Sequence, residues 1–375
     1  MTKSCENSSE IARHGASVLP GGLVVAPFAG GAVSFEANAC VGEDAGALLG
    51  RLLGEVRKRG LAPVQGNIFG DPKAACKSLS GLDFPLAVLG RHGTPFGNVQ
   101  SARVLALPEG AFTRVRRAGT SVGAFWQTGG ARYLLLGALV PADLSAPPDV
   151  QSAELWRALV PLLASQGFAL TDIVRTWFYN DHILDWYADF NRVRTAFFNE
   201  HDIFGKLVPA STGVGACNTA GAALSLDVLA VVRESGVSAK EVVSPLQRSA
   251  NEYRSAFSRA VELAEDRGRL LLVSGTASIE PSGLTVFQGD LDEQIKLSLR
   301  VVEAIVKSRG MAWGDVSRAV LYFPDIAWMA RFEPCRQALG IPPFPAIYAH
   351  CDICRDDLLF ELEVDLWAAQ GVEKK

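Results

Sequence analysis

Two glutamates near the C-terminus are the first candidates for chemistry. In residues 357–364 (DLLFELEV), apolar side chains alternate with Glu361 and Glu363, and this pattern predicts a strand with two different faces. A carboxyl group set between Phe360 and Leu362 beside a core loses hydration, which favours its neutral form, and a neutral glutamic acid can donate a proton near neutral pH. The alternative is an ordinary strand whose glutamates form a water-facing side, and the strand considered alone favours this alternative.

Two further motifs suggest ligand binding. Gly213 and Gly215 flank one residue in a predicted loop, where the backbone could approach a ligand closely and its N–H groups could bind an anionic oxygen. An ordinary tight connection is the alternative, and the spacing of a nucleotide-binding loop is absent. His350, Cys351 and Cys354 resemble zinc ligands, but the two cysteines would point to opposite faces of a strand and no second ligand pair follows. We therefore expect no metal site.

The elements that must position these residues occur twice. A strand, a helix, a connection with a second strand, and a second helix are predicted at 134–136, 152–166, 167–179 and 184–198, and again at 270–272, 291–309, 310–322 and 326–339. The copies match without a gap at Gly167 and Gly310, Ala169 and Ala312, Asp172 and Asp315, Arg175 and Arg318, and Tyr179 and Tyr322. This alignment places Glu361 opposite Ser225. The scaffold thus keeps its apolar positions but not the carboxylate, which favours a functional Glu361, although a structural carboxylate could diverge in the same way.

The predicted organisation follows from this repeat. Residues 45–71 could be a degenerate third copy, or simply the helix followed by a strand that is common in α/β chains. The expected divisions are a flexible tail at 1–17, a degenerate unit at 18–97, a second unit at 98–232 and a third unit at 233–375, which carries the glutamate strand. The fold class is therefore α/β (α+β), with fused units that each contain a mixed sheet.

Composition limits the partners and the compartment. The 375 residues contain 36 Lys and Arg against 40 Asp and Glu, a net charge of −4, and no basic block, which argues against nucleic acid and anionic membranes as partners. No apolar run reaches membrane-spanning length, the N-terminus lacks the apolar segment of a signal peptide, and the cysteine number is odd, at seven. We expect a cytoplasmic protein with a small-molecule ligand.

Several runs resemble the Rid (YjgF) family. They are residues 255–261, 272–279, Gly289 with Asp290, Gln294, Gly310, Asp315 with Val316, Pro345 with Ala346, and 360–364. The resemblance implies a chorismate-mutase-like sheet with two helices on one face, in trimers with sites at the subunit interfaces. In this chain the units would be fused, so we expect a monomer that acts as a pseudo-trimer.

More narrowly, residues 186–194, 211–215, 274–279 and 352–361 resemble the chorismatases, which cleave the enolpyruvyl ether of chorismate and release pyruvate. The likeness runs from about residue 98 onward. It implies a cofactor-free enzyme that forms a hydroxybenzoate (3- or 4-hydroxybenzoate) or a dihydroxycyclohexadiene carboxylate. Glu361 would donate the proton to the enolpyruvyl methylene, and residues near Ala277 and Cys354 would decide the product.

The dianionic substrate needs cationic partners, and the planar guanidinium of arginine pairs with a carboxylate through two bonds. Arg194 is the first candidate and Arg355 the second, with Arg175 behind them. The backbone from Thr212 to Gly215 and the side chain of Ala277 would shape the pocket, with Cys354 lining it and Tyr187 and Tyr348 as walls.

Two other functions stay open. A Rid-type deaminase would release ammonia from an imino or enamino acid, but ordinary Rid deaminases carry an arginine after the Pro-Ala pair, where this chain has Ser211 and Ile347. A non-catalytic Rid-like protein that binds a small molecule is the other alternative.

Overall fold

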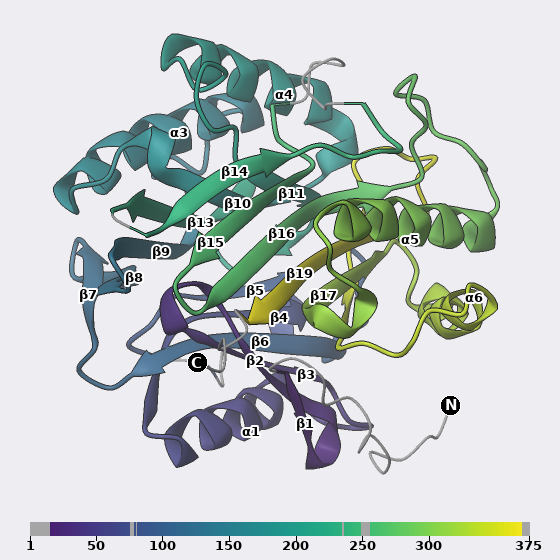
Figure 1. The fold of residues 1–375 in the computed structure, drawn as a ribbon, viewed down its shortest axis with the longest axis horizontal. Coiled ribbons are helices and arrows are strands. Elements are labelled where there is room, and N and C mark those ends of the chain that lie inside the picture. The colour runs from purple at the N-terminus through teal and green to yellow at the C-terminus, as the bar shows by residue number, and fades with distance from the viewer. Residues whose placement is uncertain (1–15, 76–78, 80, 235, 249–255, 370–375) are drawn as a thin grey trace, which may run out of the picture.

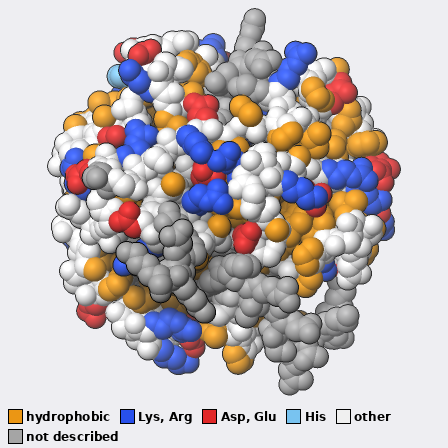
Figure 2. Space-filling model, in the orientation of Figure 1, with side chains coloured by type: hydrophobic (Ala, Val, Ile, Leu, Met, Phe, Trp, Pro, Cys, Tyr) orange, Lys and Arg blue, Asp and Glu red, His pale blue; other side chains and the backbone are white. Residues whose placement is uncertain are grey.

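The computed structural model describes residues 16–75, 79, 81–234, 236–248 and 256–369, so most of the predicted tail lies outside the described residues. Three β-sheets face one another in the centre of the molecule, and their helices cover the outer faces (Figure 1). Among the described residues, no helix has the length and apolarity needed to cross a membrane. On the face shown in Figure 2, Lys and Arg side chains are interspersed with Asp, Glu and hydrophobic side chains.

The first sheet has the strand order β1-β2-β3-β6-β4-β5-β12. Its strands are β1 (Ser17–Leu19), β2 (Leu23–Pro27), β3 (Val33–Asn38), β4 (Leu61–Gly70), β5 (Leu86–Gly90), β6 (Val99–Pro108) and β12 (Cys217–Asn218), and its helices are α1 (Ala45–Lys58) and the short α2 (Pro72–Ala75). Helix α1 begins at its N-cap Asp44, whose side chain accepts a hydrogen bond from the Ala47 N–H, and it buries Leu48, Leu49 and Leu52. Since β6 belongs to this sheet, the first unit extends beyond its predicted end at residue 97.

The second sheet has the order β11-β10-β13-β9-β8-β7. It contains β7 (Phe112–Arg117), β8 (Thr120–Thr128), β9 (Ala131–Leu139), β10 (Ile173–Asn180), β11 (Ala210–Gly215) and β13 (Leu224–Arg233), with α3 (Pro148–Ser165), α4 (Ile183–Glu200) and the 3-10 turn η3 (Leu170–Asp172). The predicted loop at 211–215 is therefore wrong. These residues form the edge strand β11, which pairs in parallel with β10.

The third sheet has the order β14-β15-β16-β19-β17-β18. It contains β14 (Ser238–Val242), β15 (Ala260–Glu265), β16 (Gly268–Ala277), β17 (Val316–Phe323), β18 (Ile347–His350) and β19 (Glu361–Ala369), with α5 (Leu291–Ser308), α6 (Phe332–Ala338) and the 3-10 turns η5 (Trp313–Asp315) and η6 (Ile326–Arg331). The second predicted helix, 326–339, is thus a 3-10 segment followed by a short α-helix. The last strand begins at Glu361, four residues later than predicted.

All three sheets share one topology, which confirms the fused-unit fold. The orders β2-β3-β6-β4-β5, β8-β9-β13-β10-β11 and β15-β16-β19-β17-β18 correspond strand by strand, and in each sheet only the last pair is parallel. The segment at 45–71 is therefore the helix and strand of a complete third unit rather than an isolated helix–strand pair.

The inner faces of the sheets form one common core. Phe69, Tyr179 and Tyr322, which come from three different sheets, meet there with ring centroids 6.1 and 6.2 Å from Phe69. Each outer face packs on its own helices as a separate cluster. Because both faces of every sheet are covered, polar side chains on the inner faces are buried, and they must find partners there.

Candidate active site

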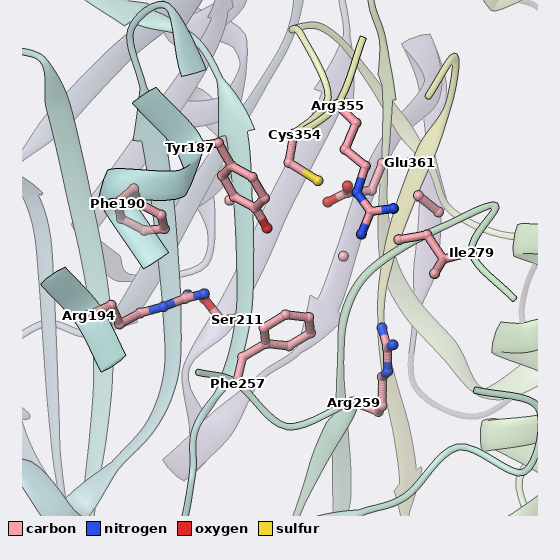
Figure 3. Close-up of a pocket in the computed structure, with 13 residues that line it drawn as sticks. Tyr187, Phe190, Arg194, Ser211, Phe257, Arg259, Ile279, Cys354, Arg355 and Glu361 are labelled. Atoms are coloured by element: carbon pink, nitrogen blue, oxygen red, sulfur yellow. The ribbon is translucent and has the colours of Figure 1, made fainter. Parts of the chain in front are cut away.

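A cavity lies between the second and third units. Its empty space, including the part that is open to solvent, is about 540 Å³. The second unit contributes α4 and the edge strand β11, and the third unit contributes β16, the segment before β15 and the loop before β19. The lining residues are Tyr187, Phe190, Arg194, Ser211, Gly213, Phe257, Arg259, Gly275, Ala277, Ile279, Cys354, Arg355 and Glu361. Figure 3 shows these side chains around the cavity.

Glu361 lies on the inner face of β19 together with Glu363 and Asp365. The neighbouring residues Leu362 and Val364 point the other way, into the cluster beneath α5. The water-facing alternative is wrong, because Glu363 and Asp365 are fully buried and Glu361 is only 5% exposed. The reason is tertiary: the face that would be wet in an isolated sheet packs against the other two sheets.

The two neighbouring glutamates have opposite ionisation. Burial, with a contribution from the negative charge of Glu363, raises the pKa of Glu361 to about 8. Burial also acts to raise the pKa of Glu363, but Arg318, Arg175 and the Thr212 hydroxyl outweigh it and lower that pKa to about 2. One carboxyl is therefore protonated at neutral pH while the other is an anion. When the pKa values of two neighbouring carboxyl groups differ in this way, the neutral group can donate a proton and the ionised group acts through its charge.

A close backbone approach at Gly275 fixes the position of the Glu361 carboxyl group. A Cβ atom at residue 275 would lie 2.0 Å from Glu361 Oε1 and 2.9 Å from its Cδ. The carboxyl therefore packs directly against the β16 backbone, which a side chain at 275 would prevent. In Figure 3 the Glu361 carboxyl lies near the side chain of Cys354, with which it interacts.

Glu363 is the centre of a buried ionic network. Arg175 Nη2 donates to Glu363 Oε2 at 3.0 Å, Trp177 Nε1 donates to Oε1 at 3.2 Å, and Arg318 Nη2 also donates to Oε1. Arg318 Nη1 bonds Asp365 Oδ2 at 2.6 Å. Arg175 is fully buried and does not line the cavity, so its place is in this network rather than against a ligand.

Three arginines line the cavity. Arg194 of α4 stacks on the Phe190 ring with 4.9 Å to the centroid, and its Nη2 donates to Asn191 Oδ1 at 2.8 Å. Arg355 Nη1 donates to the Gly283 carbonyl at 2.8 Å. Arg259, which the sequence did not single out, lies across the Phe257 ring from Arg194. A cavity with three guanidinium groups around one neutral carboxyl suits an anionic ligand.

Tyr187, Ala277 and Cys354 also line the cavity. The Tyr187 hydroxyl interacts with the Cys354 thiol. Burial is the main reason that the pKa of this thiol is raised to about 12. The thiol is therefore protonated at neutral pH and acts as a wall rather than as a nucleophile. Figure 3 shows the Tyr187 ring pointing into the cavity from α4.

Three predicted pocket residues lie elsewhere. Tyr348 packs against Phe323 and Phe332 in the outer cluster of the third unit. The Gly215 N–H donates to the Asp352 carbonyl at 2.7 Å, so it is not available to an anion, and regular strand geometry explains why the predicted N–H cradle does not form. Thr212 is buried behind the lining, with its hydroxyl bonded to Arg175 and Gly275.

The His350 and cysteine run does not gather into a ligand set. The His350 ring contacts Thr94 Oγ1 at 2.8 Å and the Pro324 carbonyl at 3.1 Å, whereas Cys351 is buried in the common core. Within the described ranges, the group with suitably close ligand atoms is His92, Asp181 and His182, outside the cavity.

Phe257, Arg259 and Gly275 line the cavity but were not predicted individually from the sequence. Arg259 lay inside the run 255–261 that carried the family resemblance, and Gly275 lay inside 274–279. The sequence signal for these residues was therefore their position inside the two runs that resemble known families. Their roles were not visible because Phe257 meets Arg194 and Gly275 meets Thr212 of a neighbouring unit, and no local pattern reports such a contact.

Comparisons with known proteins agree with this fold and these motifs. The family model described as Endoribonuclease L-PSP matches residues 248–351. The 3-hydroxybenzoate synthase of Streptomyces hygroscopicus is 27% identical over 247 residues, which are 58% of this chain and 70% of that protein. The chorismatase of the same organism is 28% identical over 238 residues, 56% of this chain and 66% of the relative.

A crystal structure of a chorismatase covers 81% of this chain and 92% of its own, with a TM-score of 0.61 and 20% sequence identity. This similarity shows a shared fold. Taken with the matched family model and the two related sequences, it supports a chorismatase-family protein built from Rid-like units.

Proposed function

We propose that the protein cleaves the enolpyruvyl ether of chorismate, with Glu361 as the proton donor. The observation that carries this proposal is a single buried carboxyl, with its pKa raised to about 8 by burial, at the edge of a cavity lined by three arginines. The products are pyruvate and either a hydroxybenzoate (3- or 4-hydroxybenzoate) or a dihydroxycyclohexadiene carboxylate. The related 3-hydroxybenzoate synthase and chorismatase support this substrate class.

The reaction begins with a proton transfer. The neutral Glu361 carboxyl gives its proton to the terminal methylene carbon of the enol ether, which becomes a methyl group, and the adjacent carbon becomes an oxocarbenium ion. When water attacks this carbon, its proton returns to the Glu361 carboxylate, and the ether C–O bond of the resulting hemiketal breaks to release pyruvate and the dihydroxycyclohexadiene carboxylate. When a hydroxyl group of the substrate attacks instead, a ketal forms, and loss of a ring proton with cleavage of its C–O bonds gives the hydroxybenzoate and pyruvate. General acid help of this kind contributes roughly 10²–10⁴-fold to a rate.

The arginines hold the substrate without removing the donor's proton. Arg194 and Arg259 come from opposite sides of the cavity and flank the Phe257 ring. Arg355, which lines the same cavity, offers a third guanidinium. Two guanidinium groups can pair with the two carboxylates of chorismate through charge-assisted hydrogen bonds. Ser211 stands where ordinary Rid deaminases carry arginine, so imino acid binding in their manner is disfavoured.

The test is to incubate the purified protein with chorismate, to measure pyruvate, and to identify the aromatic product by chromatography. We expect pyruvate release by the wild-type protein and a loss of at least about 10²-fold in the Glu361→Gln variant, since amide nitrogen cannot act as the acid. Absence of pyruvate above background would remove the proposal. Ammonia release from an imino acid would support a Rid-type deaminase instead, and full turnover in Glu361→Gln would remove only the assigned donor.

A further inference from the structure

The Glu361 carboxyl is connected to the buried anion Glu363 by two routes. The first is through space: both side chains project from the inner face of β19, two residues apart, and Leu362 between them points to the other face. The second is a chain of hydrogen bonds. Arg175 Nη2 bonds both Glu363 Oε2 at 3.0 Å and Thr212 Oγ1 at 2.7 Å.

Thr212 completes the second route. Its Oγ1 accepts the Gly275 N–H at 3.0 Å, and its hydroxyl also bonds Glu363. Gly275 is the residue against which the Glu361 carboxyl packs, and the Thr212 methyl lies 3.2 Å from the Cβ position of Gly275. Thr212 therefore bonds three groups near the proton donor: Glu363 of β19, Arg175 of β10 and the Gly275 backbone of β16.

We propose that Glu363 and Thr212 are positioning residues for the proton donor: Glu363, fixed as an anion by Arg175 and Arg318, keeps the nearby Glu361 carboxyl protonated, and Thr212 holds Gly275 against it. This inference rests on the proposed role of Glu361. Neither residue lines the cavity, so both act through Glu361 and not through contact with the substrate.

The charges around Glu361 decide the sign of the effect. The titratable and charged groups that face it are Glu363 on its own strand, Arg175 on β10, Arg194 and Tyr187 on α4, Arg259 before β15, Tyr322 on β17, and Cys351, Cys354 and Arg355 in the loop before β19. Among the described residues in this list, Glu363 is the only carboxylate. Its removal leaves arginines as the charged groups in this list, and their positive charge stabilises the ionised form of Glu361.

The experiment measures kcat and kcat/KM for chorismate from pH 5.5 to 10 in wild-type, Glu363→Gln and Thr212→Val proteins. We expect the alkaline limb of kcat to move to lower pH by about one pH unit or more in Glu363→Gln, and by less in Thr212→Val, with KM at low pH nearly unchanged. Thr212→Ser keeps the hydroxyl and should restore the wild-type profile.

Thr276→Val is the matched control. Thr276 is a buried threonine of the same strand as Gly275, but its hydroxyl bonds the Ser274 carbonyl at 2.9 Å and has no link to Glu363. Its pH profile should equal that of the wild type. Folded Glu363→Gln and Thr212→Val proteins whose alkaline limbs stay at the wild-type pH would overturn the proposal. If Glu363→Gln fails to fold, Thr212→Val with its Thr212→Ser rescue decides the question.

A second measurement separates this inference from the proposed function. The infrared band of a protonated carboxyl, in the difference spectrum between wild-type and Glu361→Gln proteins, reports the ionisation of Glu361 without substrate. We expect this band to disappear at a lower pH in the Glu363→Gln background than in the wild-type background. A protein that turns over no chorismate would refute the proposed function, whereas an unchanged titration of the band would refute the role of Glu363.

Discussion

Glu361 and Ser225 occupy equivalent positions in two of the three units. Glu361 pairs with Tyr322 across β19 and β17, and Ser225 pairs with Tyr179 across β13 and β10. In the first unit, Ser101 pairs with Phe69 in the same way. Three similar interfaces are thus present in one chain, but a carboxyl stands at only one of these three equivalent positions.

The interface between the third and first units is closed by side chains at the corresponding place. Asn38 Nδ2 donates to the Ala346 carbonyl at 2.9 Å, and the Tyr348 N–H donates to Asn38 Oδ1 at 3.0 Å. Ser101 Oγ donates to the Tyr348 carbonyl at 2.6 Å. The edge strand β18 is therefore occupied by polar contacts from the first unit, while β11 at the other interface borders the cavity.

The first prediction concerns stability against pH. Because Glu361 has a folded-state pKa of about 8, above its ordinary value of 4.5, the folded protein holds a proton that the unfolded chain loses, and stability falls between about pH 4.5 and pH 8. Glu361→Gln removes this penalty. We expect the variant to be more stable than the wild type by on the order of 3–5 kcal/mol above pH 8, with little difference below pH 4.5.

Denaturant unfolding of both proteins at pH 4.5, 6, 7 and 9 measures this difference. The Glu36 carboxyl, whose pKa burial raises to about 7, contributes the same trend to both proteins and cancels in the comparison. A constant gap between the two stability curves at all pH values would contradict the raised pKa.

The second prediction is the pH dependence of the wild-type enzyme. The acid form of Glu361 is needed for the first proton transfer, so kcat should fall with a slope of one proton above about pH 8, where this carboxyl ionises. Initial rates of pyruvate formation at saturating chorismate, from pH 6 to 10, give this limb. A limb centred near pH 4.5 would instead indicate a solvated carboxyl.

The third prediction tests the contact at residue 275. In Gly275→Ala the new methyl group would overlap Glu361 Oε1, so the carboxyl must move away from its position. We expect kcat to fall by about 10²-fold or more, because a misplacement of about 1 Å can cost that much. Gly314→Ala, where no atom lies within 4 Å of the new Cβ, is the control and should keep wild-type kinetics.

The fourth prediction concerns substrate binding by α4. Arg194→Lys removes the planar pair of donors, and we expect kcat/KM for chorismate to fall by roughly 10–100-fold. The matched control is Arg192→Lys on the same helix, whose side chain is 61% exposed and pairs with Asp149 and Asp189. Equal kinetics for the two variants would argue that Arg194 has no contact with the substrate.

The fifth prediction separates structure from activity at the closed interface. Asn38→Ala removes the hydrogen bonds to the Ala346 carbonyl just before β18 and from the Tyr348 N–H of β18, and leaves partly buried groups without these partners. We expect a loss of about 1–3 kcal/mol in unfolding free energy and unchanged kcat and KM, because this contact lies at another interface. Thermal unfolding and the pyruvate assay measure the two effects. A large change in KM would indicate that the units move together.

Local sequence determined a large part of the fold. The spacing of leucines in α1, the repeat from Gly167 to Tyr179 and again from Gly310 to Tyr322, and the apolar alternation around Glu361 depend on neighbours along the chain, so the elements and the duplication could be read from it. The same alignment matched Arg175 to Arg318 and Glu361 to Ser225, which the strand pairing confirms.

Tertiary structure alone decided that the face of β19 with the acidic side chains is buried. In sequence, Glu361 and Glu363 share one polar face, but Arg175 from β10 and Arg318 from β17 make Glu363 an anion, whereas burial and the negative charge of Glu363 favour a neutral Glu361. The partners of these side chains lie between 45 and 188 residues away. Ionisation depends on hydration and on charges at short distances in space, and spacing along the chain specifies neither of these for residues that meet across units.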